Sequence, residues 1–180
     1  MNGSTRPLLL LLATASCALA ASHPIFDDTH DPWYGYPYGG TTSGGIERRS
    51  DGKVVAFHGD DREYSGWTVG FDTLHLQNIR RTGGVSFQIR GAKGGEKILV
   101  GLLDDESDGK EHKVQVQVDL SAYTALSKTW QTIDIPLADF ADRGRWWNSA
   151  ARSEVEGVFD WNRILEFRLA SNRGANVAKD

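Results

Sequence analysis

Residues 129–140 read TWQTIDIPLADF, and this stretch carries the clearest structural signal in the chain. Apolar, β-branched residues alternate with polar ones, which is the pattern of a strand with one buried face. Pro136 ends that pattern, because proline fixes its own φ angle and has no N–H to donate to a sheet. The stretch is therefore predicted to be a strand that stops at Pro136, with Asp139 capping the turn that follows.

Further stretches on both sides also have the composition of strands. The turn residues Gly, Asp and Ser separate them, and no window of a dozen residues carries a helical stripe. Short strands without long helices predict an all-β fold, an antiparallel β-sandwich of two sheets. The predicted strands are 53–59, 66–71, 84–91, 97–103, 113–120, 129–137 and 163–171.

The two ends of the chain differ from this pattern. Residues 1–20 have a basic start, an apolar run and the small residues ALA at the end, which predicts a secretory signal peptide cleaved after Ala20. The disfavoured alternative is a lipoprotein anchored at Cys17, and the apolar run is too short to span a membrane. Residues 21–45 are rich in Gly, Pro and aromatics without a period, which predicts a leader, so the sandwich domain is assigned to 46–180.

Charge and motif content exclude several classes of function. The formal net charge is −4, which gives the protein no electrostatic reason to bind nucleic acid or anionic lipid. Cys17 is the single cysteine, and the zinc-protease and nucleophile-elbow motifs are absent. A hydrolase with two carboxylates facing a cleft stays open as a further interpretation. The spacing of the carboxylates along the sequence does not show which of them could form such a pair.

The stretch 130–140, the later aspartate-tryptophan pair and the strand ILEFRLAS together resemble the galactose-binding-like β-sandwich superfamily. Its members include carbohydrate-binding modules of the family 11 type and complex I intermediate-associated assembly-factor domains. The similarity runs from Phe26 to Asn172, nearly the whole exported chain. It implies a jelly-roll sandwich and is more specific for the fold than for the ligand.

The resemblance has three structural consequences. Trp130 and Trp161 are expected to pack inside the sandwich. Such domains usually close with a further strand after the segment that ends here at Asp180, so the sandwich is expected to lack its last strand. Many relatives hold a structural calcium, to which Asp27 and Asp28 correspond loosely; no other cofactor is expected.

A second calcium hypothesis comes from the spacing of acidic residues in 104–112, DDESDGKEH. The spacing imitates the start of a calcium loop. Gln115 stands where an EF-hand requires glutamate, so an EF-hand is excluded. A weak calcium site and a solvated hairpin tip both stay open, and the hairpin tip is favoured.

Sugar recognition needs aromatic faces for stacking and amide, carboxylate or guanidinium groups for the hydroxyls. Side chains two apart on a strand point the same way, so polar strand faces could line one site; a plain solvated face is the alternative. The polar candidates are Gln88, Arg90, Gln115, Gln117 and Arg168. Glu166 lies on the same strand face as Arg168. The aromatic candidates for the rim are Tyr64, Trp67, Trp146 and Trp147.

The sequence thus predicts a secreted or periplasmic, non-catalytic domain that holds a polysaccharide or oligosaccharide on a polar sheet face. It could accompany a glycoside hydrolase. The alternative is a protein-interaction or assembly domain, in which Trp146 and Trp147 contact a partner protein. The signal peptide favours the first hypothesis, because an organellar assembly factor would carry an Arg-rich transit peptide.

Overall fold

The structure, a computed structural model, describes residues 32, 34–39, 41–50, 52–59, 65–105 and 112–171. The predicted signal peptide, Asp27, Asp28 and Tyr64 lie outside the described residues, as does any strand after 171. Three single 3-10 turns are η1 (Gln77–Ile79), η2 (Leu120–Ala122) and η3 (Leu137–Asp139). The strands are β1 (Tyr34–Gly39), β2 (Thr41–Arg49), β3 (Gly52–Gly59), β4 (Ser65–Leu74), β5 (Gly84–Ile89), β6 (Ile98–Asp104), β7 (Gln115–Asp119), β8 (Gln131–Pro136), β9 (Arg143–Asn148), β10 (Ser153–Val158) and β11 (Ile164–Ser171).

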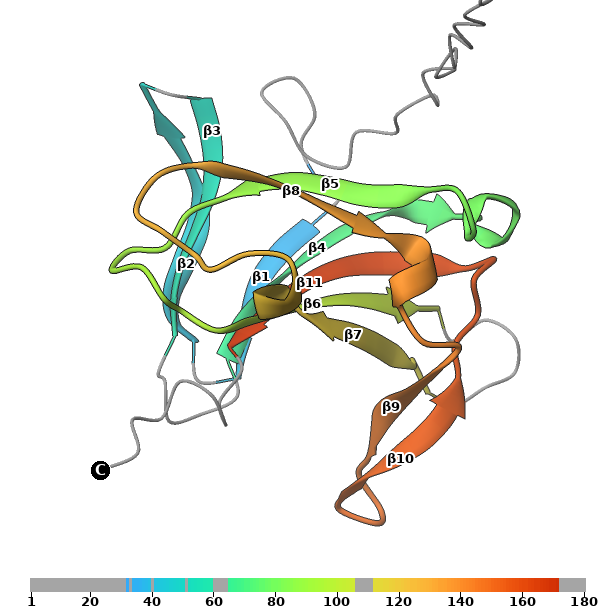
Figure 1. The fold of residues 1–180 in the computed structure, drawn as a ribbon. Helices are drawn as coiled ribbons and strands as arrows, with labels where there is room; N and C mark the ends of the chain where they lie inside the picture. The colour runs from blue at the N-terminus through green and yellow to red at the C-terminus, as the bar shows by residue number, and fades with distance from the viewer. Residues whose placement is uncertain are drawn as a thin grey trace, which may run out of the picture.

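The strands form a sandwich whose larger layer is a seven-stranded sheet in the order β1-β4-β11-β6-β7-β9-β10. The β5–β8 ribbon lies across one side of this sheet, and the β9–β10 hairpin bends away on the other side (Figure 1). The β2–β3 hairpin contacts β1 and β4. All the strand pairs are antiparallel, so the predicted all-β antiparallel sandwich is confirmed.

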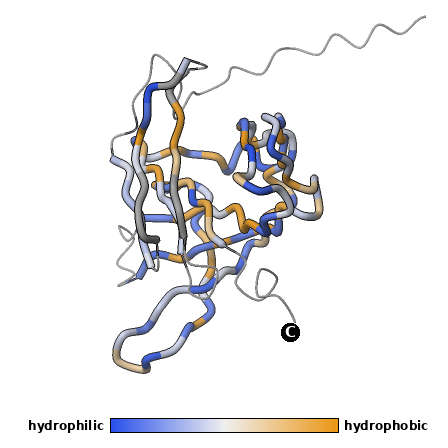
Figure 2. The backbone as a smooth tube through the Cα atoms, turned by 90° about the vertical axis from the view of Figure 1, so that its left-hand side faces the viewer, coloured by the Kyte–Doolittle hydropathy of each residue, from blue (hydrophilic) through white to orange (hydrophobic). Residues whose placement is uncertain are grey.

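The core lies between the seven-stranded sheet and the β5–β8 ribbon. Apolar and polar segments alternate along the strands (Figure 2), as half-buried strands require. Phe87 of β5 meets Phe167 of β11 edge to face, with 5.3 Å between ring centroids. Other core side chains from the two layers are Val100, Leu102, Val116, Ile133 and Ile135.

The structure adds strands where none were predicted. Residues 34–39, assigned to the leader, form β1 and pair with β4 along its length. Residues 143–158, for which no strand was predicted, contain the β9–β10 hairpin. Both segments pair at or near a sheet edge, where little of the strand is buried and the apolar alternation is correspondingly weak.

One prediction about buried groups needs correction. Trp161 is 4% exposed, as predicted for a core tryptophan, whereas Trp130 is 38% exposed and lies outside the core. The calcium hypothesis for 104–112 stays a prediction, because 106–111 lie outside the described residues, whereas Asp104 itself is fully buried. Its two carboxylate oxygens accept the N–H groups of Val114 and Asp160 at 2.6 and 2.9 Å. The Asp104 carboxylate therefore links the end of β6 to the segments before β7 and before β11.

Candidate functional site

The candidate site is the face of the seven-stranded sheet turned away from the core, here called the open face. Strand register brings residues from six strands into one row across it. The row runs Tyr34–Gly70–Glu166–Leu103–Gln115–Arg145, from β1 to β9. Five interstrand spacings of about 4.8 Å make this row about 24 Å long, enough for several sugar rings.

Glycines on both sides of β11 let side chains from more distant strands reach its centre. Gly70 of β4 lies beneath the Tyr34 ring, where a Cβ atom would collide with the ring carbons. On the other side, a Cβ atom on Gly101 of β6 would lie 3.1 Å from the side-chain nitrogen of Gln115. Side chains from β1 and β7 thus cross their neighbouring strands and converge on β11.

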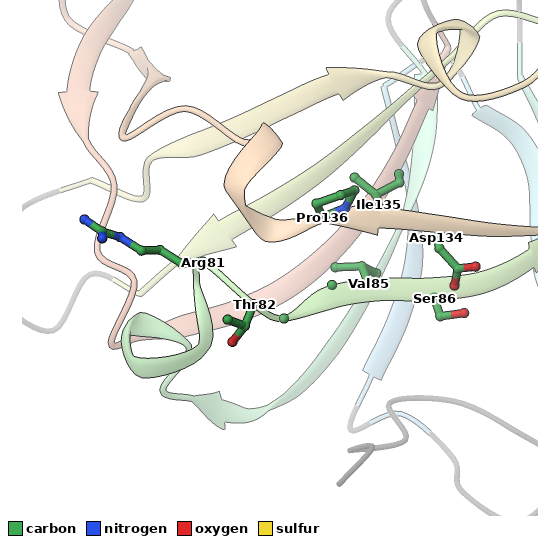
Figure 3. A pocket seen from close by; sticks show the side chains of 9 residues that line it. Arg81, Thr82, Val85, Ser86, Asp134, Ile135 and Pro136 are labelled. Carbon is green, nitrogen blue, oxygen red and sulfur yellow. The ribbon is translucent and has the colours of Figure 1, made fainter. Parts of the chain in front are cut away.

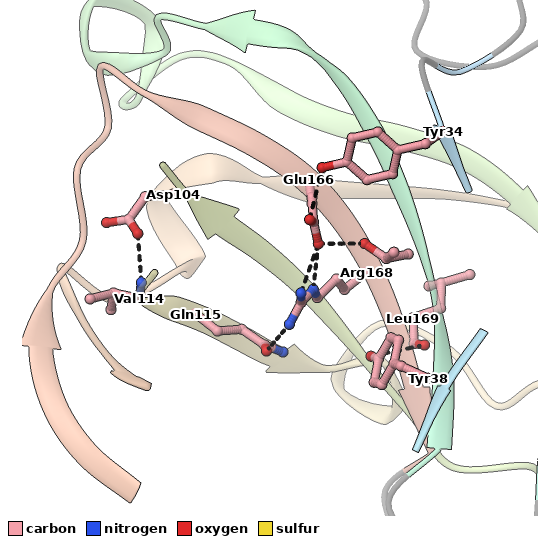
Figure 4. A network of polar contacts seen from close by, with 9 residues as sticks. Tyr34, Tyr38, Asp104, Val114, Gln115, Glu166, Arg168 and Leu169 are labelled. Carbon is pink, nitrogen blue, oxygen red and sulfur yellow. Dashed lines mark hydrogen bonds and ion pairs between the residues drawn. The ribbon is translucent and has the colours of Figure 1, made fainter. Parts of the chain in front are cut away.

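A hydrogen-bonded network occupies the centre of the open face (Figure 4). Glu166, 2% exposed, accepts hydrogen bonds from the hydroxyls of Tyr34 at 2.8 Å and Thr68 at 2.7 Å. Arg168 donates to the same carboxylate from Nε at 2.9 Å, and its Nη2 lies 2.7 Å away. Its Nη1 donates to the Gln115 side-chain oxygen at 3.0 Å. Glu166 therefore fixes the plane of the Arg168 guanidinium.

The electrostatics of this network keep Glu166 ionised. Burial alone would raise the pKa of the Glu166 carboxyl. The Arg168 charge and the hydrogen bonds from Thr68, Tyr34 and Arg168 outweigh burial and hold that pKa below its ordinary value. Burial and the bond to the carboxylate raise the pKa of Tyr34, so its hydroxyl stays protonated as a donor.

Aromatic side chains stand at both ends of the open face. Tyr36, 44% exposed, stacks on Tyr34 with 5.8 Å between ring centroids, and Tyr38 lies 5.3 Å from the Arg168 guanidinium. At the far end, Trp147 lies two residues beyond Arg145 on β9, so it shares the open face, and it is 61% exposed. The two ends offer stacking surfaces, and the centre offers hydrogen-bonding groups.

The structure divides the predicted site residues. Gln115, Gln117, Arg168 and Trp147 share the open face. Of the others, Trp67 is wrong as a rim residue, because it is 4% exposed on the core side of β4.

Other candidates are separated from the open face by the sheets themselves. Gln88 and Arg90 follow the outward side of the β5–β8 ribbon, across the core, so they cannot join the same site. Trp146 is half-buried and stacks on His112 with 3.9 Å between ring centroids. The two adjacent tryptophans therefore point to opposite sides of β9, and together they form no exposed patch for a partner protein.

The residues that sequence reasoning missed are Thr68 and the tyrosines of β1. Tyr34, Tyr36 and Tyr38 recur at every second position, which is a strand signal. The intervening Gly35 and Pro37 concealed it, since both residue types are typical of turns.

Two hollows of the described surface lie away from the open face. A shallow depression of about 410 Å³ adjoins the β5–β8 ribbon (Figure 3), and a smaller one of about 270 Å³ lies beside it, around Tyr123. The open face has the stacking surfaces that a glycan site needs, so it is the stronger candidate for the principal site. In the described part of the chain no helix is long and apolar enough to cross a membrane. Among the same residues no His, Cys, Asp and Glu side chains are grouped to hold a metal.

Comparison with known families matches residues 23–178 to carbohydrate binding domain 30. Comparison with the curated proteins gives no match. A solved family 30 carbohydrate-binding module superposes with a TM-score of 0.62 and 17% identity, covering 82% of this chain and 87% of that one.

Two further solved structures come from Clostridium thermocellum. The family 30 module of its cellulosomal cellulase Cel9D-Cel44B matches with a TM-score of 0.57 and 17% identity, over 82% of this chain and 86% of that one. Its family 11 module, in complex with a β-1,3-1,4-mixed-linked tetrasaccharide, matches with a TM-score of 0.52 and 17% identity, over 81% and 84%. These likenesses show a shared fold, and they give no support to the assembly-factor resemblance.

Proposed function

The chain belongs to the family 30 carbohydrate-binding modules, and from that premise we propose that it binds an unbranched β-glucan chain along the open face. The observation that carries this proposal is the order of groups across the sheet. Tyrosine rings stand at one end, the Arg168–Gln115 cluster at the centre and Trp147 at the other end. Pyranose rings present apolar faces for stacking and hydroxyls for such polar groups.

The central network suits a neutral chain. Glu166 balances the charge of Arg168, so the centre of the face presents donors without a net charge. The Nη1 atom of Arg168 donates a hydrogen bond to the side-chain oxygen of Gln115. Gln117, two residues further along β7, is exposed. The mixed-linked β-1,3-1,4-glucan held by the structurally similar family 11 module is therefore the first probe for this domain.

Replacing Tyr36 or Trp147 with alanine is expected to weaken binding of soluble β-1,3-1,4-glucan about tenfold each, the loss typical of one important contact residue. Both side chains are exposed, so the free energy of unfolding should change by less than about 0.5 kcal/mol. Native affinity electrophoresis of the full chain, in gels with mixed-linked glucan, xylan or mannan, measures the loss.

Val155→Ala is the matched control. Val155 lies on the β9–β10 hairpin, as Trp147 does, but it pairs with Trp146 and so lies on the opposite face of the hairpin from Trp147. Its retardation should equal that of the wild type. Unchanged binding by both the Tyr36 and Trp147 variants would show that the glycan does not lie on the open face. Loss in only one variant would restrict the site to that end. A folded wild-type chain that no polymer retards would contradict the proposed function.

We infer in addition that the module acts outside the cell. Family 30 modules and the N-terminal composition support export, since 1–20 has the three parts of a secretory signal. The mass of the exported protein is expected to correspond to a chain that begins at Ala21. A lipid-modified chain beginning at Cys17, or a protein that keeps 1–20, would contradict cleavage after Ala20.

A further inference from the structure

The outward side of the β5–β8 ribbon carries a second row of polar side chains. Strand register pairs Ser86 with Asp134 and Gln88 with Thr132, and all four residues are exposed. Val85, Phe87 and Ile133 alternate with them and pack into the core, so the polar set points outward. With the flanking pair of Arg90 and Trp130, these residues form what is here called the second strip: Ser86, Gln88, Arg90, Trp130, Thr132 and Asp134.

An aromatic surface stands at one end of the second strip. Trp130 precedes β8 and Arg90 follows β5, so the pairing of Ile89 with Gln131 brings the two side by side. The Arg90 guanidinium lies 4.8 Å from the centroid of the Trp130 ring, a cation–π contact. The strip thus combines an indole ring, one face of which Arg90 covers, with a guanidinium donor.

Four polar side chains of the second strip are free to bind a ligand. Within the described part of the chain, the side chains of Ser86, Gln88, Thr132 and Asp134 make no hydrogen bond or ion pair with other residues. On the open face, by contrast, the Glu166 carboxylate is already occupied by its neighbours. Hydroxyl, amide and carboxylate groups follow Trp130 for about 13 Å along β8, at the strand rise of about 3.3 Å per residue.

Two surface depressions beside the second strip support a binding site there. Asp134 lines both depressions, the larger shared with Ser86 and Arg81 (Figure 3) and the smaller with Thr132 and Tyr123. The second strip is therefore hollowed on both sides of Asp134, where the ring of a bound sugar could be seated. Neither depression reaches the open face, because both lie on the ribbon across the core.

We propose that the second strip is a second glycan-binding site, so that one module holds two polysaccharide chains, one on each face. The ligand class rests on the proposed function. The chemistry of the strip favours a neutral glycan: its two charged side chains, Arg90 and Asp134, have opposite signs, which leaves no net charge to attract a polyanion. Trp130 is its single large apolar side chain, too little for the apolar centre of a protein interface.

The test removes the open-face site first. The full chain carrying both Tyr36→Ala and Trp147→Ala is examined by affinity electrophoresis in gels with mixed-linked β-1,3-1,4-glucan, xylan or mannan. We expect residual retardation by at least one polymer, and a further loss of about tenfold when Trp130→Ala is added. Because Trp130 lies directly before β8, its replacement could disturb the strand, so the pair Gln88→Ala and Thr132→Ala, both exposed, provides a second variant with less effect on folding.

The outcomes distinguish the two proposals. If at least one polymer retards the wild type but none retards the folded double variant, the open face accounts for all of the binding and the second strip is refuted. Residual retardation that survives both the Trp130 and the Gln88/Thr132 changes would also refute it, because the contact would then lie elsewhere. If no polymer retards the wild type, the proposed function fails and the second site fails with it. Loss in both variants on that background supports the second site.

Discussion

Replacing Glu166 with alanine is expected to lower the free energy of unfolding by about 3 kcal/mol and to abolish glycan retardation. Removing one member of a buried charge pair leaves the other without its partner, which costs 3 kcal/mol or more. The Arg168 side chain is 19% exposed, so partial hydration keeps the cost at the lower end of that range. Tyr34 and Thr68 also lose the acceptor for their hydroxyls. Urea unfolding and affinity electrophoresis measure the two effects.

Glu156→Gln is the control for this change. Glu156 pairs with Arg143 at 3.7 Å on exposed strands, and an exposed pair contributes less than about 1 kcal/mol. A loss of stability in Glu166→Ala no larger than in this control would show that the central network is not held by its buried charge.

The pH dependence of stability isolates the charge of Glu166. Since folding lowers its pKa, the carboxylate stabilises the folded state at pH values above its ordinary 4.5. That stabilisation is lost as the pH falls below 4.5 through the lower pKa of the folded state. Glu166→Gln does not titrate, so the difference in stability between wild type and variant should shrink over this interval. A difference that stays constant from pH 7 to pH 3 would contradict the assigned pair.

Replacing Gly70 with alanine is expected to cost about 2 kcal/mol of stability and more than tenfold in glycan affinity. A Cβ atom at this position would collide with the Tyr34 ring, and overpacking of this kind typically costs 1 to 3 kcal/mol. The displaced ring would lose its hydrogen bond to Glu166 and its stacking contact with Tyr36. Thermal unfolding and gel retardation of the full chain give the two values.

Gly45→Ala supplies the matched glycine control. A Cβ atom on Gly45 of β2 would have no neighbour within 4 Å, so the variant should bind like the wild type and unfold within about 0.5 kcal/mol of it. If Gly70→Ala binds glycan as the wild type does, the Tyr34 ring is not part of the binding surface.

Each layer of the sandwich serves a separate purpose in this arrangement. The core side of the seven-stranded sheet packs against the β5–β8 ribbon, which leaves both outward surfaces open to ligands. The centre of the open face is held by buried hydrogen bonds, whereas the aromatic side chains at its ends are exposed. The exposed aromatic side chains at the ends can therefore be replaced without destabilising the fold, whereas replacing the buried side chains at the centre destabilises it.

Local sequence determined the secondary structure of those strands in which apolar side chains alternate regularly with polar ones. In 129–140 the alternation of Ile133 and Ile135 with polar residues identified β8, and Pro136 marked its end. The same period identified β5, β7 and β11. Because every second side chain of such a strand is buried, apolar and polar residues alternate in the sequence. These strands can therefore be predicted without tertiary information.

Only the tertiary structure decided which polar faces combine. Gln88 and Arg168 have the same local pattern, yet they lie on opposite layers, because strand order depends on pairings between distant segments. Trp67 and Trp130 exchanged their expected environments for the same reason: burial of an aromatic ring depends on the neighbouring strand. Tyr34 reaches Glu166, 132 positions away in sequence, because β4 lies between their strands and has a glycine where they cross.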